Sequence, residues 1–458
     1  MAEGFRVRDP VHNFLQLREE EAELLGTRLF QRLRGIRQLA LASLVYPGAL
    51  HTRFDHSLGV CHVAGMMAEQ LGLSQDDVEL VRQAALLHDL GHGPFSHVSE
   101  NMLKRYAHPV TIPEGQKKEK IHELITAHLI ANNGQIVDIL GKHSCERIAK
   151  LLSAGHGQPV LRSIVSGPLD ADKQDYLLRD SLFCGVQYGV FDIHQFHRSL
   201  TLFGAEDEKE LMIIPDGVHA VEQYVLAKYY LTTNVYRHRV RLITDQMIVR
   251  SIVLGIEEDG LTDLERVYAF DNSAPFMEHY SEWDDARLLH AFDSKAQPQS
   301  LCGELLHRLQ VRQLHKQVYS KRIEEPTFRD PLVRERLASL GKKENDALRN
   351  ELEVEITAIL DKNGCGKIEP RFVIVHGFDI DSVRTSSRND EASIMVVRTG
   401  GPRPFEQDSS LFASINEGYA EAYVEVYAPV SWDSRAERQK LKAALDRPIT
   451  ECVESICK

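Results

Sequence analysis

Three histidines and one aspartate lie within ten positions of the sequence, and their side chains suit a divalent metal ion. His88 and Asp89 are adjacent, so an imidazole nitrogen and a carboxylate oxygen can bind the same cation. His92 comes four residues after His88, and on a continuing helix the two rings would share one face. His97 adds a further imidazole. A lone histidine is most often an ordinary core residue, but this density of ligands favours a functional site.

A second set of candidate residues shares one face of a later predicted helix. At offsets of 0, 4, 7 and 8 along it stand Asp172, Tyr176, Arg179 and Asp180. Two acids, a phenol and a guanidinium on one face can hold a metal and phosphates together, although a salt-bridged surface would look much the same. His56, near the start of an earlier predicted helix, is a possible third nitrogen ligand, or else a helix cap or surface residue.

Separate helices must bring these residues together. Ser74 and Asp77 have the spacing of a helix start, so we expect a helix over residues 75–90 that ends with the His-Asp pair. A break at residues 166–170 precedes the helix that carries Asp172. Helical spacing also recurs over residues 17–42, 121–125, 219–256 and 301–319, and the helix with His56 near its start is expected to end at about Leu71.

Runs of β-branched and aromatic residues predict strands in the C-terminal third of the chain. They lie at residues 372–375, 393–397 and 423–427. Since the helical pattern changes around residues 326–331, we place a domain boundary near residue 325. The sequence therefore predicts a mainly α protein, with a helical core domain over residues 1–325 and a smaller C-terminal α+β lobe over residues 326–458.

Composition narrows the classes of protein to consider. With 458 residues the chain can form two or three domains, and 43% hydrophobic and 26% charged residues are ordinary for a globular protein. A net charge of −13 makes nucleic acid an unlikely partner. The seven cysteines are widely spaced and include no Cys-x-x-Cys, so we expect free thiols in a reducing compartment. Without an apolar leader or a run of about 18 apolar residues, we expect a cytoplasmic protein that does not enter membranes.

Three longer stretches carry a resemblance to a known family. They are Pro47 to Val60, Leu87 to His97, and Asp170 to Asp180. In this order they resemble the HD-domain metal phosphohydrolases, and more narrowly the SAM and HD domain-containing deoxynucleoside triphosphate triphosphohydrolases and their bacterial relatives. The likeness covers nearly the whole chain, apart from the SAM domain, which has no counterpart in this sequence. It implies that the helical core over residues 1–325 is an HD phosphohydrolase domain.

The resemblance also implies roles for individual residues. The metal ligands would be His56, His88, Asp89 and Asp172. The catalytic positions would be taken by His92, His97 and His122, with Glu123 as partner of His122 and Glu100 nearby. Phosphate would be held by Arg53, Lys173 and Tyr176, and sugar and base by Asp180, Gln38 and Leu39. His238 would lie on the long helix that closes the pocket.

The implied reaction is metal-dependent hydrolysis of a deoxynucleoside triphosphate (dNTP) to a deoxynucleoside and inorganic triphosphate. A divalent ion, whether Mn, Mg, Fe or Zn, would activate water and polarise a phosphoryl oxygen. Arg53 and Lys173 would neutralise phosphate charge, and His97 would hand a proton to the departing sugar oxygen. The resemblance further implies a homo-oligomer, either a dimer or a tetramer.

Two departures from the family pattern keep alternatives open. Gly26 stands where an Asp is expected to read guanine at a regulatory site together with Gln31 and Arg34. Asn234 stands where the family has a further phosphate-binding Arg. The protein could therefore be an HD phosphohydrolase of another nucleotide, such as a monophosphate, a cyclic nucleotide or an alarmone, or a nucleotide-binding sensor with little turnover.

Overall fold

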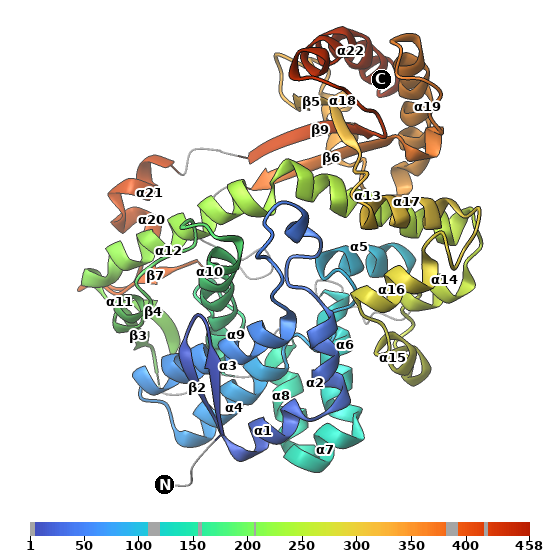
Figure 1. Cartoon of the computed structure of the whole chain (residues 1–458). Coiled ribbons are helices and arrows are strands. Elements are labelled where there is room, and N and C mark those ends of the chain that lie inside the picture. The colour runs from blue at the N-terminus through green and yellow to red at the C-terminus, as the bar shows by residue number, and fades with distance from the viewer. Residues whose placement is uncertain (1–4, 109–119, 154–157, 206–207, 382–392, 416–419) are drawn as a thin grey trace. The chain divides into compact units, whose positions relative to one another are not determined.

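The computed structural model describes residues 5–108, 120–153, 158–205, 208–381, 393–415 and 420–458, and most of them are helical (Figure 1). The chain forms two compact units. Unit 1 contains Met1–Tyr236, Glu265–Leu288 and Val383–Glu417, and unit 2 contains Arg237–Leu264, Leu289–Ser382 and Gly418–Lys458. The predicted fold class, mainly α with small sheets toward the C-terminus, is confirmed. Because the units alternate along the chain, the single boundary near residue 325 stays a prediction.

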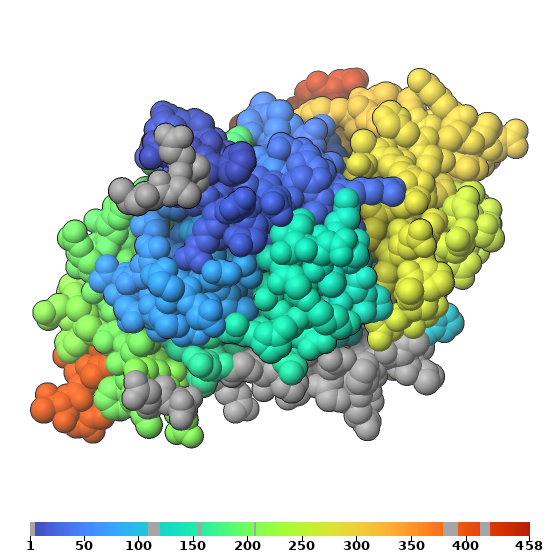
Figure 2. Space-filling model, turned by 90° about the horizontal axis from the view of Figure 1, so that it is seen from below, coloured from blue at the N-terminus to red at the C-terminus, as the bar shows by residue number. Residues whose placement is uncertain are grey.

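Unit 1 begins with an antiparallel hairpin of β1 (Phe5–Asp9) and β2 (Asn13–Leu17). The helical spacing over residues 17–42 is divided between two helices, because α1 (Glu19–Leu25) stops at Gly26 and Thr27 caps a new helix, α2 (Arg28–Arg32). Short 3-10 turns follow at Leu33–Gly35 and Ala42–Leu44. In the view of Figure 2 this N-terminal segment, dark blue, lies beside the teal segment that includes α7 (Gly134–Leu140), which contacts α1.

Five helices of unit 1 carry the candidate site. They are α3 (Arg53–Gln70), α4 (Gln75–Leu87), α5 (His97–Tyr106), α6 (Ile121–Asn132) and α10 (Ala171–Cys184). Helix α3 packs against both α4 and α10, and its small residues Gly59 and Gly65 permit this. A Cβ on Gly59 would come within 1.9 Å of the Asp175 carboxylate, so only glycine fits there. Side-chain caps fix the starts of α4 and α10, where Ser74 and Asp170 accept backbone hydrogen bonds.

The remaining elements of unit 1 surround these helices. They are α8 (Lys142–Leu152), α9 (Pro159–Val165), α11 (Ile193–Arg198), α12 (Val218–Leu231), α15 (Ala274–Tyr280), α20 (Phe405–Asp408) and α21 (Ser410–Ile415). A four-stranded sheet has the order β3-β4-β7-β8, with β3 (Leu200–Phe203), β4 (Glu210–Ile213), β7 (Met395–Val396) and β8 (Arg403–Pro404). The strand predicted at residues 393–397 therefore pairs with β4 of unit 1, whereas we expected it in the C-terminal lobe.

Unit 2 is built around a three-stranded antiparallel sheet of order β5-β9-β6. Its elements are α13 (Arg239–Glu257), α17 (Leu301–Gln310), β5 (Lys316–Arg322), α18 (Pro331–Ala338), α19 (Asp346–Lys362), β6 (Ile374–Asp381), β9 (Ala420–Ala428) and α22 (Arg435–Ile456). The apolar face of the sheet, with Val318, Val375, Val424 and Val426, is buried in one core with residues of α18, α19 and α22. Helices α14 (Thr262–Tyr268) and α16 (Asp285–Phe292) cross the division between the units.

Two predicted helices are interrupted. Residues 316–319 belong to β5 and pair with β9, although we expected the helix from residue 301 to continue through them. The long helix expected over residues 219–256 is divided into α12 and α13 by a π-helical turn at Thr232–Tyr236. Within the described residues, each helix is too short or too polar to cross a lipid bilayer. All seven cysteines are described, and none forms a disulfide with another.

Candidate metal centre and active site

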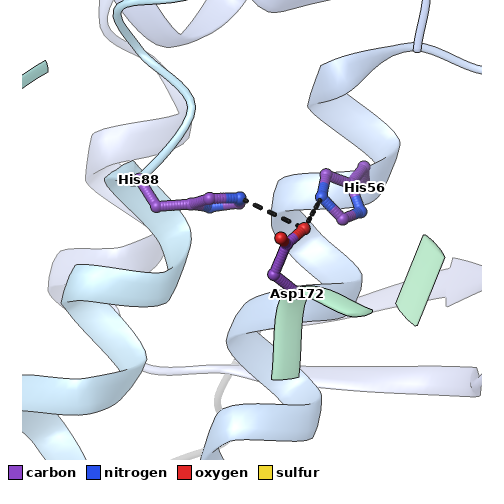
Figure 3. A group of neighbouring side chains, drawn as sticks. All are labelled: His56, His88 and Asp172. Carbon is purple, nitrogen blue, oxygen red and sulfur yellow. Dashed lines mark hydrogen bonds and ion pairs between the residues drawn. The ribbon is translucent and has the colours of Figure 1, made fainter. Parts of the chain in front are cut away.

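Three side chains from three helical segments converge on one point (Figure 3). His56 lies in the first turn of α3, His88 directly follows α4, and Asp172 lies in the first turn of α10. One ligand atom of each lies within 4.8 Å of the others. The Asp172 Oδ1 atom is 3.0 Å from His56 Nε2 and 3.8 Å from His88 Nε2. Imidazole nitrogen and carboxylate oxygen are a donor set that divalent transition metals accept.

The second nitrogen of each imidazole is held by the protein. His56 Nδ1 lies 2.8 Å from Asp175 Oδ2, and His88 Nδ1 donates to the Ala85 carbonyl oxygen at 2.7 Å. A proton fixed on Nδ1 leaves the Nε2 lone pair for a cation, as in protein metal sites generally. His88 Nε2 is buried and has no hydrogen-bond partner among the residues that the structure describes. These orientations fit a metal ion.

The electrostatics of the group also favour a cation. Burial lowers the pKa of His56, but hydrogen bonds to Asp172 and Asp175 outweigh this and raise it to about 10. Burial raises the pKa of Asp172, but both imidazoles outweigh it and hold that pKa well below the ordinary value. The negative potential that retains a proton on His56 would equally stabilise a bound metal ion.

Asp89 lies beside the three ligands rather than within their group. Its Oδ1 is 3.3 Å from His88 Nε2 and 3.3 Å from His92 Nε2. Its Oδ2 accepts a hydrogen bond from Arg53 Nη1 at 2.5 Å and lies 3.9 Å from His56 Nε2. Asp89 thus links the metal-binding group to the imidazoles and to Arg53.

A second imidazole cluster adjoins Asp89. The rings of His92 and His122 stack at 3.9 Å, and that of His97 stands edge-on to His92 at 6.2 Å. His92 and His97 do not reach this place by helical spacing, because α4 ends at Leu87. The expected sharing of a helix face by His88 and His92 is therefore wrong, and a turn with a hydrogen bond from the His92 backbone to the Asp89 carbonyl places the ring instead.

The partner of His122 differs from the expected one. Its Nδ1 donates to Glu100 Oε2 at 2.8 Å, and Glu100 also accepts from the backbones of Ile121 and His122. Burial raises the pKa of Glu100, but the His122 contacts outweigh it and lower the pKa to about 2. Glu123 instead caps α6 by accepting from the Lys120 backbone, so its expected pairing with His122 is wrong.

The predicted phosphate-holding residues flank the group on α3 and α10. Arg53 is 3% exposed, and its Nη2 has no partner among the described residues. Lys173 donates to Asp170 Oδ2 at 2.5 Å. The half-buried Tyr176 lies near Tyr236, with ring centres 6.2 Å apart.

The predicted sugar and base contacts are buried. Asp180 Oδ1 is 2.7 Å from His51 Nε2, and Asp180 Oδ2 accepts from Tyr236 at 2.6 Å. Gln38 and Leu39 are buried, and the Oε1 atom of Gln38 lacks a partner within the described ranges. His238 belongs to unit 2, where its Nδ1 accepts from the Val240 backbone and caps α13, so its role at the pocket stays a prediction.

Arg179 does not share the function that its helix face suggested. All three of its nitrogens bind carboxylates, Nε and Nη2 on Asp175 and Nη1 on Asp9, at 2.8–2.9 Å. His12 Nε2 lies 2.7 Å from the Oδ1 of the same Asp175. This closed network holds the carboxylate that orients His56.

Sequence reasoning missed two features of the site. Asp175 was seen only as part of a motif, although its position one turn after Asp172 could have indicated a partner for His56. Nothing in the sequence singles out Lys228 on α12. Burial and the positive charge of Lys173 lower the pKa of Lys228 to about 8.

Gly26 and Asn234, the residues that depart from the family pattern, each donate a hydrogen bond to a nearby residue of the chain. Gly26 ends α1, and Gln31 donates to the Leu25 carbonyl while accepting from Arg34. The exposed Asn234 donates to the Tyr230 carbonyl. A neutral amide therefore occupies the position at which the resembled family has a guanidinium.

Comparisons with known proteins show which families this chain matches. Residues 53–180 match the HD domain, and residues 191–447 match the HD associated region. The uncharacterized protein YwfO of Bacillus subtilis is 32% identical over 326 residues, which are 68% of this chain and 71% of YwfO. The deoxynucleoside triphosphate triphosphohydrolase SAMHD1 of Homo sapiens is 29% identical over 373 residues, 74% of this chain and 58% of that protein.

A solved structure supports the fold over most of the chain. A hypothetical protein from Aquifex aeolicus is similar with a TM-score of 0.68 and 25% identity, over 97% of this chain and 100% of that one. The chain spans between 53% and 71% of the length of curated relatives such as these.

Proposed function

Since the chain belongs to the family of HD-domain phosphohydrolases that also carry the HD associated region, we propose that it hydrolyses deoxynucleoside triphosphates. The products would be a deoxynucleoside and inorganic triphosphate, and the reaction would depend on a divalent metal ion. One observation carries the proposal: His88 Nε2, in the group of two imidazoles and a carboxylate, and the nearby Arg53 Nη2 are both buried and make no hydrogen bond within the described residues.

His56, His88 and Asp172 would hold the metal, with Asp89 beside them. When bound, a divalent ion such as Mn, Mg, Fe or Zn supplies positive charge that polarises a phosphoryl oxygen and activates water. The chain's own residues would do the rest of the positioning. Arg53 and Lys173 would bind the phosphates and offset the charge that develops on them, which is the main demand of phosphoryl transfer.

The imidazole cluster would manage the proton. His97 is exposed at the start of α5 and would donate a proton to the departing sugar oxygen, because an imidazole titrates near neutral pH. His122, which Glu100 holds, and His92, which stacks on it, would keep that side of the pocket in place. Asp180 would meet the sugar and Gln38 the base.

The substrate class is supported by the relatives whose names state it, SAMHD1 of several animals among them. The neutral Asn234 favours a second candidate, an HD phosphohydrolase of a nucleotide with fewer phosphates, since one guanidinium for a terminal phosphate is replaced by an amide. The homo-oligomer expected from the sequence stays a prediction.

A product assay tests the proposal. The full chain is incubated with Mn²⁺, Mg²⁺ or Fe²⁺ and a panel of dNTPs, ribonucleotides, monophosphates and cyclic nucleotides, and the products are separated by chromatography. Inorganic triphosphate with free deoxynucleoside supports the proposal. Orthophosphate, or turnover of monophosphates alone, supports the second candidate, and tight binding without products supports a nucleotide sensor.

A further inference from the structure

The carboxylate of Asp285 lies outside the metal-binding group, yet it joins two of the segments that frame it. Asp285 belongs to unit 1, begins α16 and is 7% exposed. Its Oδ1 accepts a hydrogen bond from the Phe95 backbone at 2.7 Å, and its Oδ2 accepts one from the Arg37 backbone at 3.0 Å. Because each oxygen binds a different segment, the carboxylate fixes the distance between them.

Ser96 connects the same two segments to a side chain of the site. Its hydroxyl donates to the Arg37 carbonyl oxygen at 2.7 Å and accepts from Arg53 Nε at 2.9 Å. Phe95 and Ser96 have φ values of 59° and 53°, in the left-handed region that residues other than glycine rarely adopt. Such a conformation persists only where surrounding contacts hold it, and Asp285 supplies one of them.

The guanidinium of Arg53 is the end of this chain of contacts. Its Nε is bound by Ser96 and its Nη1 by Asp89, so the plane of the group is fixed. Only Nη2 is left without a partner in the described part of the chain, and the side chain is buried. A fixed guanidinium whose Nη2 amino group has no hydrogen bond is suited to binding an anionic oxygen.

We infer that Asp285 and Ser96 are positioning residues, which direct Nη2 of Arg53 toward an oxygen of the substrate's polyphosphate. The inference rests on the proposed function, in which Arg53 holds the phosphates. Neither residue would touch the substrate. They would act by holding the Gly93–His97 segment and Arg53 in one arrangement before the substrate binds. Substrate binding then loses no conformational entropy to the ordering of these groups.

Kinetics of single variants give the first test. Ser96→Ala removes the acceptor of Arg53 Nε. We expect KM for a dNTP to rise about tenfold or more, with a smaller fall in kcat. The main effect is on KM because the bound substrate already carries the polyphosphate charge that Arg53 binds. Asp285→Ala, which loses both acceptors, should have a larger effect than Asp285→Asn. The matched control is Asp284→Asn, because Asp284 accepts from the Arg287 backbone and should leave KM unchanged.

A double-mutant cycle separates positioning from general structural damage. Binding of inorganic tripolyphosphate with Mn²⁺ is measured by calorimetry for Ser96→Ala in the natural chain and in an Arg53→Ala chain, with thermal unfolding as a check on folding. We expect weaker binding only where Arg53 is present. This result would support the inference even for a protein that hydrolyses no dNTP, which would contradict the proposed function alone. Equal losses in both chains, or no loss in either, would overturn the inference.

Discussion

Each of the two units contains a buried arginine paired with a carboxylate. The two pairs differ in whether all of their buried polar atoms are hydrogen-bonded. In unit 2, Arg250 donates to Glu353 and to the Arg371 carbonyl, while Glu353 also accepts from the Val375 backbone. Neither residue keeps a buried polar atom without a partner among the described residues. In unit 1, Arg53 binds Asp89 and Ser96, but its Nη2 makes no hydrogen bond within the described part of the chain.

This difference distinguishes a buried charge that stabilises the fold from a buried charge that binds a ligand. A buried charge without full compensation is costly, so a folded protein retains one mainly where a ligand completes it. Arg250 and Glu353 are complete without a ligand and can serve the fold alone. Arg53 Nη2 and His88 Nε2 make no hydrogen bond within the described residues and lie at or beside a group suited to a metal, which is the pattern of a binding site.

We expect the largest effect on activity from a change in the metal-binding group of unit 1. Asp172→Ala removes the carboxylate that lies near both imidazoles, so we expect loss of bound metal and a fall in kcat of at least about 10,000-fold. Metal analysis and a turnover assay measure this, with the exposed Asp76→Ala as control. Full activity of Asp172→Ala would contradict the ligand assignment. Thermal unfolding should change little, since Asp172 is one-third exposed.

A change in the Arg250–Glu353 pair should lower stability and leave activity unchanged. Glu353→Gln leaves the buried Arg250 charge without its partner, and we expect the free energy of unfolding to fall by about 3–5 kcal/mol, with kcat per folded molecule unchanged. Urea denaturation measures the loss. Glu355→Gln, at an exposed position of the same helix, is the control. An unchanged stability for Glu353→Gln would remove the basis of the comparison.

Arginine-to-lysine exchange at both pairs sharpens the contrast. Arg53→Lys keeps the charge but cannot bind Ser96, Asp89 and a phosphate oxygen at once, so kcat/KM should fall about 100-fold. Arg250→Lys should lower stability and leave kcat/KM of the folded protein unaltered. Steady-state kinetics and denaturation on the same preparations distinguish the two. If both exchanges lowered only kcat/KM, or both lowered only stability, the distinction between a ligand-binding arginine and a structural one would be wrong.

The smallest effect concerns pH and a histidine of unit 2. Burial lowers the pKa of His315 to about 3, and its Nε2 donates to the Phe372 carbonyl at 2.8 Å. Because the folded state binds this proton less readily than the unfolded chain, stability is full above about pH 6.5 and decreases as the pH falls toward 3. Between pH 7 and 5 the natural chain should lose about 2 kcal/mol more than His315→Gln. Urea denaturation at both pH values, with the exposed His219→Gln as control, would show equal losses if the account is wrong.

Local signals in the sequence predicted much of the helical framework. Ser74 and Asp170 sit where helix caps belong, and both caps are present, so the starts of α4 and α10 follow from short-range chemistry. The strand β5 was missed because a run such as residues 316–319 has little periodicity, and its pairing with β9 more than 100 residues away decides its state. The alternation of the chain between two units has no local signal either.

The candidate site shows the same limit. The resemblance placed His56, His88 and Asp172 in one group, and the structure brings them together. Their supporting contacts depend on distant parts of the chain: Asp175 binds His12 across 163 positions, and Asp285 binds Phe95 across 190. Glu123 follows His122 directly, yet its cap contact with Lys120 leaves Glu100 as the partner of the imidazole.

The central claim is that His56, His88 and Asp172 hold a divalent metal ion. A crystal structure of the full chain soaked in Mn²⁺, with anomalous diffraction measured near the manganese edge, tests it most directly. The account predicts one strong anomalous peak between His56 Nε2, His88 Nε2 and Asp172 Oδ1, absent from Asp172→Ala. A map with no peak there, or with manganese bound only elsewhere, would contradict it.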